Sequence, residues 1–174
     1  MDEREAGPAG GAYEEALEGA LHMARRLALL HMAYARTLVD ALGEEAGRAL
    51  IERAIRAYGE RIGERTRRRV EALGLEPTPE NFREGSDLSQ ALFPTRAVEV
   101  EGEARSRSMG CVLYDIWREY GEEDLGALYC LVDPAKMEGY HPDWTMVHTQ
   151  RLPLGDACCE MAVRPTSPRD AGTA

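Results

Sequence analysis

Cysteine, histidine and aspartate side chains gather in the last third of the chain. Residues 128–160 hold three of the four cysteines and two of the four histidines. A cysteine thiolate is a nucleophile, histidine is a general base near neutral pH, and a carboxylate can hold a cationic group. The segment therefore predicts a reaction centre, a metal site, or the cysteine-containing core of a small sheet.

Three of these side chains have a predicted helical setting. Cys111 is expected to begin a helix, whose N-terminal end would lower the pKa of its thiol. Cys130 and Asp133 are three residues apart, so their side chains share one face of a helix. No C-x-x-C or H-x-x-x-H spacing occurs, and the sequence therefore predicts no metal and no cofactor. A metal site assembled from distant residues, or thiols buried as small hydrophobic groups, are the alternatives.

Cys158 and Cys159 are neighbours on a predicted strand and must point to opposite faces. Alternation places Cys159 in an apolar row that packs, and leaves Cys158 available in a polar row with Glu160 and Arg164. A shift of the hairpin by one residue would exchange the two cysteines. Asp156 shares the face of Cys158 if the strand has already begun, and otherwise it serves the turn.

The histidines divide into two pairs. His22 and His31 occupy core-like positions on the first predicted helix, where a packing role is expected. His148 lies in a predicted strand and His141 at a predicted helix end, close to cysteines and aspartates in the sequence. Either of the second pair is a candidate general base.

The elements that must position these residues form one α+β domain, residues 12–165, between disordered tails at residues 1–11 and 166–174. Hydrophobic periodicity predicts helices over 13–42 and 44–73, a β-hairpin over 96–109, helical segments between 111 and 140, and strands over 145–152 and 157–164. The expected architecture is an N-terminal helical hairpin packed with a small antiparallel sheet and a second helix pair. Gly59 and Gly63 predict a bend or close packing in the second helix.

The formal net charge of −10 disfavours binding to nucleic acid or to an anionic membrane surface. Glutamates precede and follow the arginines of residues 61–69 at helical spacing, which is typical of a solvated helix face with ion pairs, and an anion-binding patch is the alternative. No apolar run is long enough to span a bilayer and the first residues are acidic, so a cytoplasmic protein is expected. Exposed apolar stripes on the two N-terminal helices would indicate a homodimer.

Several separated motifs together resemble the L-2-amino-thiazoline-4-carboxylic acid hydrolase family. The matching stretches are "SMGCVLYDIW", "LYCLVDP", "GYHP", "VHT" and "GDACC", in this order. Val112 departs from the family pattern, in which proline often follows the first cysteine. The resemblance implies hydrolytic opening of a small-molecule substrate, the cyclic amidine 2-amino-thiazoline-4-carboxylate, to a carbamoyl-cysteine on the way to cysteine. The expected class is a hydrolase of non-peptide C–N bonds.

Hydrolysis of such a ring needs a nucleophile, a base, a partner for the exocyclic amino group and a cation for the carboxylate. We assign these four roles, in this order, to Cys130 or Cys158, to His148, to Asp156 or Asp133, and to Arg164 or Arg151. Five further residues are expected to bind substrate: Cys111, Tyr140, His141, Cys159 and Glu160. A small-molecule or metal-sensing module, similar to the vinyl-4-reductase type of domain, and a scaffolding protein with core cysteines are the competing hypotheses.

Overall fold

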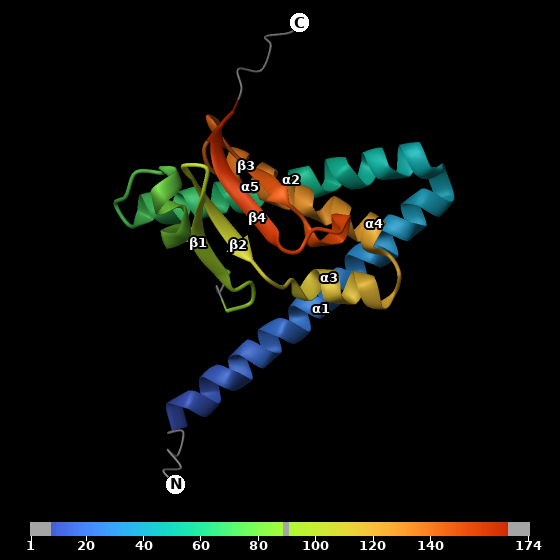
Figure 1. Cartoon of the computed structure of the whole chain (residues 1–174), viewed down its shortest axis with the longest axis horizontal. Coiled ribbons are helices and arrows are strands. Elements are labelled where there is room, and N and C mark those ends of the chain that lie inside the picture. Colours follow the sequence, from blue (N-terminus) through green and yellow to red (C-terminus); the bar gives the residue numbers. More distant parts are fainter. Residues whose placement is uncertain (1–7, 89–90, 167–174) are drawn as a thin grey trace, which may run out of the picture.

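Two long helices open the chain and form an antiparallel hairpin. The computed structural model describes residues 8–88 and 91–166. Helix α1 spans Pro8–Leu42 and α2 spans Glu44–Ala72, with Gly43 between them (Figure 1). Helix α1 therefore begins before the expected end of the N-terminal tail, and the remaining tail positions, 1–7 and 167–174, lie outside the described residues.

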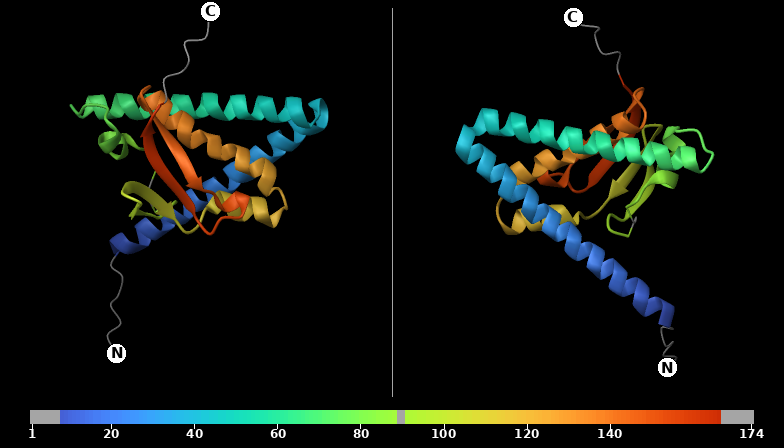
Figure 2. Two further views of the ribbon diagram at one scale, coloured as in Figure 1. Left: turned by 45° about the horizontal axis from the view of Figure 1, so that its top comes forward. Right: turned by 180° about the vertical axis from the view of Figure 1, so that it is seen from behind.

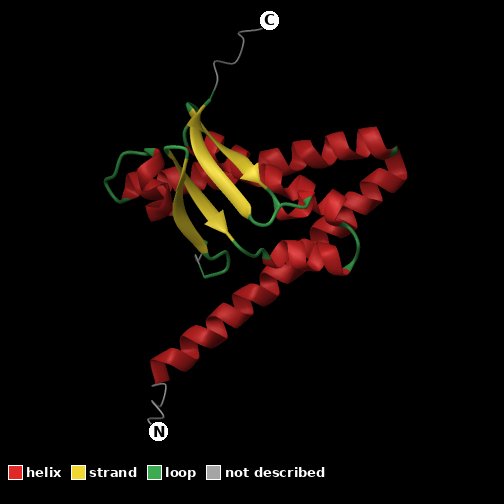
Figure 3. Ribbon diagram, viewed as in Figure 1, coloured by secondary structure: helices red, strands yellow, loops and turns green. Residues whose placement is uncertain are grey.

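Four short strands form one antiparallel sheet in the order β1-β2-β4-β3 (Figure 3). Their bounds are Thr95–Val100 (β1), Glu103–Ser108 (β2), Trp144–Gln150 (β3) and Cys159–Pro165 (β4). The predicted hairpin is confirmed: Glu101 and Gly102 join β1 to β2 with φ of 54° and 80°, the pair of positive values that a tight hairpin turn requires. A bulge between His148 and Gln150 interrupts the β3–β4 pairing.

Short helices connect the two hairpins of the sheet. They are α3 (Val112–Glu119), α4 (Glu123–Gly126), the 3₁₀ segment η2 (Ala127–Leu131) and α5 (Val132–Tyr140). Two further 3₁₀ turns lie outside this connection, η1 (Pro79–Gly85) before β1 and η3 (Leu152–Leu154) between β3 and β4. Because the residue before a proline avoids helical geometry, the sequence by itself predicts a break after Asp133 or a kink at Pro134. Instead α5 begins at Val132, so the proline lies in the first turn, where its missing N–H has no helical partner to lose.

Helix α5 packs on one face of the sheet and α2 packs on α5, as the view from behind shows (Figure 2). A Cβ atom on Gly59 would lie 2.8 Å from the carbonyl oxygen of Val132, and one on Gly63 would lie 2.6 Å from the amide nitrogen of Tyr140. These two glycines therefore provide the close helix packing that the sequence predicted. Met137 and Tyr140 of α5, fully buried, join Val70 in the core beneath β3.

The α+β class is confirmed, with the helices gathered on one side of an antiparallel sheet. No helix in the described part of the chain is long and apolar enough to cross a membrane. The helix-covered face of the sheet is the inner face below, and the opposite face is the outer face.

Candidate functional site

Asp133 lies at the centre of a polar group between α5 and the inner face of the sheet. Its carboxylate accepts a hydrogen bond from Nζ of Lys136 at 2.8 Å, and its other oxygen lies 3.2 Å from Nε2 of His148. Lys136 is one helical turn further along α5, and His148 shares the inner face of β3 with Met146. The structure therefore brings two of the predicted site residues, Asp133 and His148, into direct contact.

The electrostatics of this group keep Asp133 ionised. Burial raises the pKa of the Asp133 carboxyl, but the charge of Lys136 and the hydrogen bond with His148 outweigh it, and the pKa lies below the ordinary aspartate value. All three side chains are mostly buried, with side-chain exposures of 10–21%. Asp133 is thus a charged acceptor in a largely enclosed place.

Three thiols, from Cys111, Cys130 and Cys159, lie near enough to one another and to Asp133 to interact electrostatically. Burial, followed by the charge of Asp133, raises the pKa of Cys130 to about 12. Burial also raises the pKa of Cys111, although the nearby backbone N–H groups of Tyr114 and Leu113 oppose the shift. The expectation of a lowered pKa at Cys111 is therefore wrong, because burial exceeds the effect of the helix start.

Cys158 and Cys159 have exchanged the environments that the sequence predicted for them. Cys159 lies on the inner face, and its sulfur accepts a hydrogen bond from the backbone N–H of Leu152 at 3.5 Å. We call the three thiols together with Asp133, Lys136 and His148 the inner group. Cys158 is only 4% exposed, and its thiol donates to Oε1 of Gln150 at 3.1 Å. The expectation that Cys159 packs and Cys158 is available is thus reversed. The reason is that the row of Cys158 and Glu160 is covered by other side chains.

Glu160 is covered by arginines on the outer face. Its carboxylate accepts hydrogen bonds from Arg105 at 2.8 Å, from Arg107 at 2.7 Å and from the hydroxyl of Thr149 at 2.9 Å. The two arginines, aided by Thr149 against the cost of burial, lower its pKa to about 2. Arg164, on the same strand, bonds Glu103 at 2.7 Å. Glu160 and Arg164 therefore form an ion-pair network on the face opposite Asp133.

The structure places four other predicted site residues in structural contacts. Tyr140 is fully buried and donates its hydroxyl hydrogen bond to the carbonyl of Thr78 at 2.9 Å. The carboxylate of Asp156 accepts the backbone N–H of Arg151 at 2.6 Å, which is turn chemistry. The ring nitrogen Nδ1 of His141 accepts the N–H of Asp143. Two of this set also act on the thiols: the charge of Arg151 opposes the raised pKa of Cys130, and the charge of Asp156 contributes to the raised pKa of Cys159.

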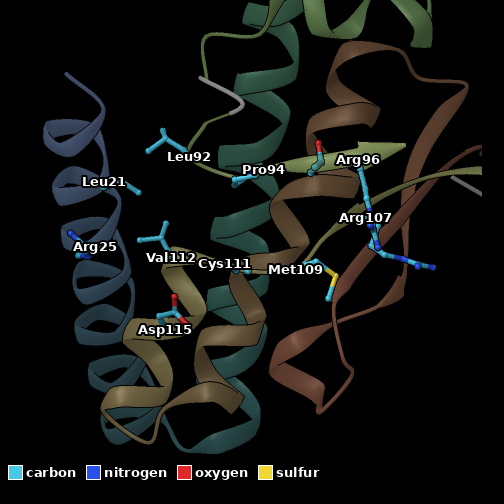
Figure 4. Close-up of a pocket in the computed structure, with 12 residues that line it drawn as sticks. Leu21, Arg25, Leu92, Pro94, Arg96, Arg107, Met109, Cys111, Val112 and Asp115 are labelled. Atoms are coloured by element: carbon cyan, nitrogen blue, oxygen red, sulfur yellow. The ribbon is translucent and has the colours of Figure 1, made fainter. Parts of the chain in front are cut away.

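A pocket of about 520 Å³ opens between the first half of α1, the β1–β2 hairpin and the start of α3. Leu21 and Arg25 of α1 form one wall, and Arg96 and Arg107 of the hairpin form the other (Figure 4). Cys111 lies at its centre, between the two walls. Cys111 is therefore the residue shared by the pocket and the inner thiol group.

The family profile described as L-2-amino-thiazoline-4-carboxylic acid hydrolase matches residues 22–163, which include the whole inner group. The chain belongs to this hydrolase family. The resemblance found in the sequence motifs is thereby confirmed. No curated protein and no solved structure matches the chain significantly.

Three residues beside the thiols and Asp133 were absent from the sequence prediction. Lys136 had a usable signal, because a lysine three residues after Asp133 in a helix forms an ion pair. Tyr129 and Tyr58 lie with ring centroids 6.3 Å apart, and burial raises the pKa of Tyr129. Tyr58 comes from α2, 71 positions before Tyr129, and no local pattern could have joined them. Within the described ranges no three histidine, cysteine or carboxylate side chains are arranged to hold a metal ion.

Proposed function

We propose that the chain opens the ring of a small cyclic amidine, of the 2-amino-thiazoline-4-carboxylate class, by cysteine-dependent hydrolysis. The observation that carries the proposal is the ionised carboxylate of Asp133, held by His148 and Lys136 beside three thiols. Family membership supports a hydrolase, and the pocket that reaches Cys111 supplies an entry for a small molecule.

The atom balance of the reaction identifies the bond that breaks. Conversion of a 2-aminothiazoline ring to a carbamoyl-cysteine adds the oxygen of water to the amidine carbon and releases the ring sulfur as a thiol. Both nitrogens stay on that carbon, so the broken bond is C–S and the expected C–N class is revised. The site must accordingly supply a nucleophile to the amidine carbon and a proton to the departing sulfur.

Cys111 is the thiol best placed to attack. It lines the pocket, and the backbone N–H groups of Tyr114 and Leu113 would stabilise its thiolate. Attack forms a bond from Sγ to the amidine carbon and breaks the ring C–S bond, after which water displaces Cys111 and leaves the carbamoyl product. This proposal replaces Cys130 and Cys158 as the candidate nucleophiles, because Cys158 bonds Gln150 and the pKa of Cys130 is raised to about 12.

The remaining roles follow from charge. Asp133 would accept hydrogen bonds from the amidinium nitrogens, and a bound cation would favour the neighbouring thiolate. His148, hydrogen-bonded to Asp133, would move the proton between thiol, ring sulfur and water. Arg25 and Arg96 of the pocket walls are proposed to hold the substrate carboxylate in place of Arg164, which is engaged by Glu103.

Single serine variants test the proposal. The purified protein would be incubated with 2-amino-thiazoline-4-carboxylate, and carbamoyl-cysteine followed by mass spectrometry. Cys111→Ser is expected to lower turnover by at least about a thousandfold, since a hydroxyl is a far weaker nucleophile. Cys158→Ser is the matched control, because serine can still donate to Gln150, and should retain turnover. Full activity in Cys111→Ser would exclude this residue as the nucleophile.

The second candidate function is a small-molecule binding module, and one observation favours it. Burial raises the pKa of all three inner thiols, so the free protein holds them protonated near neutral pH, a state that suits binding without reaction. Calorimetric titration with the same compound separates the two functions. Saturable binding without product formation would support the module.

A further inference from the structure

Helix α1 carries two apolar stripes, and the fold uses only one of them. The inner stripe packs into the domain through Ala28, Met32, Ala35 and Val39, all buried. The second stripe alternates spacings of three and four residues, which is the heptad pattern of a helix that pairs with another helix. Its members are Tyr13, Ala16, Ala20, Met23, Leu27, Leu30 and Tyr34. We call this set the outer stripe.

Most of the outer stripe faces solvent in the single chain, and only Ala20 and Leu27 of its members are half-buried. Tyr13, Met23, Leu30 and Tyr34 are 60%, 63%, 54% and 66% exposed. The half of α1 that carries most of the stripe also projects away from the body of the molecule (Figures 1 and 2). A continuous apolar row of this length is rare on a monomer surface, and a lone projecting helix receives little support from its own backbone.

Charge along α1 indicates what covers the outer stripe. Its projecting part begins with Glu14, Glu15 and Glu18 and has no basic residue before His22, whereas residues 22–37 contain Arg25, Arg26 and Arg36 and no acidic residue. A parallel pair of such helices would place like charges side by side. An antiparallel pair places the acidic end of each helix beside the basic part of the other, which is the favourable arrangement.

We propose that the outer stripe is the interface of a twofold-symmetric dimer, in which α1 of a second copy of this chain lies antiparallel on it. Side-chain sizes agree with a register in which Ala16 lies opposite Leu27 of the partner and Ala20 opposite Met23 of the partner, so that a small residue meets a larger one. Each contact occurs twice because the same patch serves both copies.

The same register places the charged flanks together. Arg26 and Glu15 lie on one side of the outer stripe, and in this register Arg26 comes beside Glu15 of the second copy. An alternative register, shifted by one heptad, would pair Ala16 with Tyr34 of the second copy. In that register the two Arg26 side chains would meet at the symmetry axis and repel each other. The charges therefore select the register that pairs the projecting halves.

Sedimentation equilibrium of the full chain tests the dimer. The wild-type protein is expected at twice the 19.3 kDa of one chain at micromolar concentration. The double variant Met23→Glu, Leu30→Glu should dissociate, with a dissociation constant raised at least about a hundredfold, because it puts four carboxylates into the seam. Leu73→Glu, at the end of α2 and 61% exposed, is the matched control and should remain dimeric. A monomeric wild type, or a double variant that stays dimeric, overturns the proposal.

Disulfide cross-linking tests the antiparallel register and does not depend on a destabilising change. Chains with Ala16→Cys mixed with chains with Leu27→Cys should cross-link to each other. Ala16→Cys alone should not self-link, since its two copies would lie about 16 Å apart along the axis. Self-linking of Ala16→Cys would show a parallel pair and overturn the antiparallel arrangement.

Discussion

At the scale of single residues, the site depends on a carboxylate that stays charged although it is largely enclosed. Asp133 achieves this through two cationic or hydrogen-bonding partners on different elements, Lys136 on α5 and His148 on β3. Both contacts go to Asp133, so its removal would take the shared partner from Lys136 and His148 at once, and an unpaired buried charge is costly. The arrangement is therefore expected to act as a unit.

Replacement of Asp133 by asparagine tests this unit. Asp133→Asn keeps the shape and removes the charge, so we expect kcat/KM to fall by about a hundred- to ten-thousandfold, the range of a lost acid–base partner. Asp156→Asn is the control, because an amide oxygen can still accept the N–H of Arg151. Turnover would be measured by product mass spectrometry across pH 5–9. Because the pKa of wild-type Asp133 lies below its ordinary value, no loss of activity from its protonation is expected in this range. Equal activity of the two variants would remove Asp133 from the reaction.

At the scale of elements, the outer face of the sheet is held by charge. Arginine partners lower the pKa of Glu160 and of Glu103 from 4.5 to about 2. A carboxyl whose pKa is lower in the folded state stabilises the fold fully above its unfolded pKa, and this contribution is lost as the pH falls toward the folded pKa. The sheet should therefore weaken between about pH 4.5 and pH 2.

Urea unfolding at several pH values measures this loss. The free energy of unfolding of Glu160→Gln should lie below that of wild type at pH 6, and the difference should shrink as the pH approaches 2, because protonation then removes the same charge from the wild-type side chain. Glu99→Gln, at an exposed position of β1, should follow the wild-type curve. A gap between wild type and Glu160→Gln that stays constant with pH would show that packing, not charge, holds Glu160.

The contact of α2 with α5 makes a second prediction at this scale. Gly63→Ala would drive a methyl group into the carbonyl of Lys136, next to the site lysine, so we expect a destabilisation of about 3 kcal/mol and reduced turnover. Gly19→Ala, in α1 with nothing within 4 Å of its added Cβ, should stabilise the protein by up to about 1 kcal/mol. Thermal and urea unfolding of both variants check the expected opposite signs.

Local patterns predicted the elements well and the environment of the site poorly. The hairpin at Gly102, the two long helices and the close packing at Gly59 and Gly63 depend on periodicity and on turn and glycine chemistry, which are written in neighbouring residues. The facing of Cys158 and Cys159 depends on a turn whose register local sequence does not fix. The raised pKa of Cys111 depends on burial by elements far away in the chain.

At the scale of the whole molecule, the proposed dimer and the proposed site share one helix. Leu21 and Arg25, which form a wall of the pocket, lie on the projecting half of α1, around the helix from Met23 and Leu30 of the outer stripe. A second copy bound to the outer stripe would hold this wall in place without covering it. Substrate affinity should then depend on the state of association.

Steady-state kinetics of the dissociating variant decide this dependence. Met23→Glu, Leu30→Glu is expected to raise KM several-fold with kcat within about twofold of wild type, because the loss affects the wall that holds the substrate carboxylate and leaves Cys111 and Asp133 in the body of the domain. Leu73→Glu should match wild type in both constants. Molecular mass would be measured at the assay concentration, so that a wild-type protein that is already monomeric is recognised as a failure of the dimer. A confirmed dissociation with unchanged KM would show that α1 holds its wall of the pocket unaided, while a fall in kcat alone would place the influence of the dimer on the reacting groups.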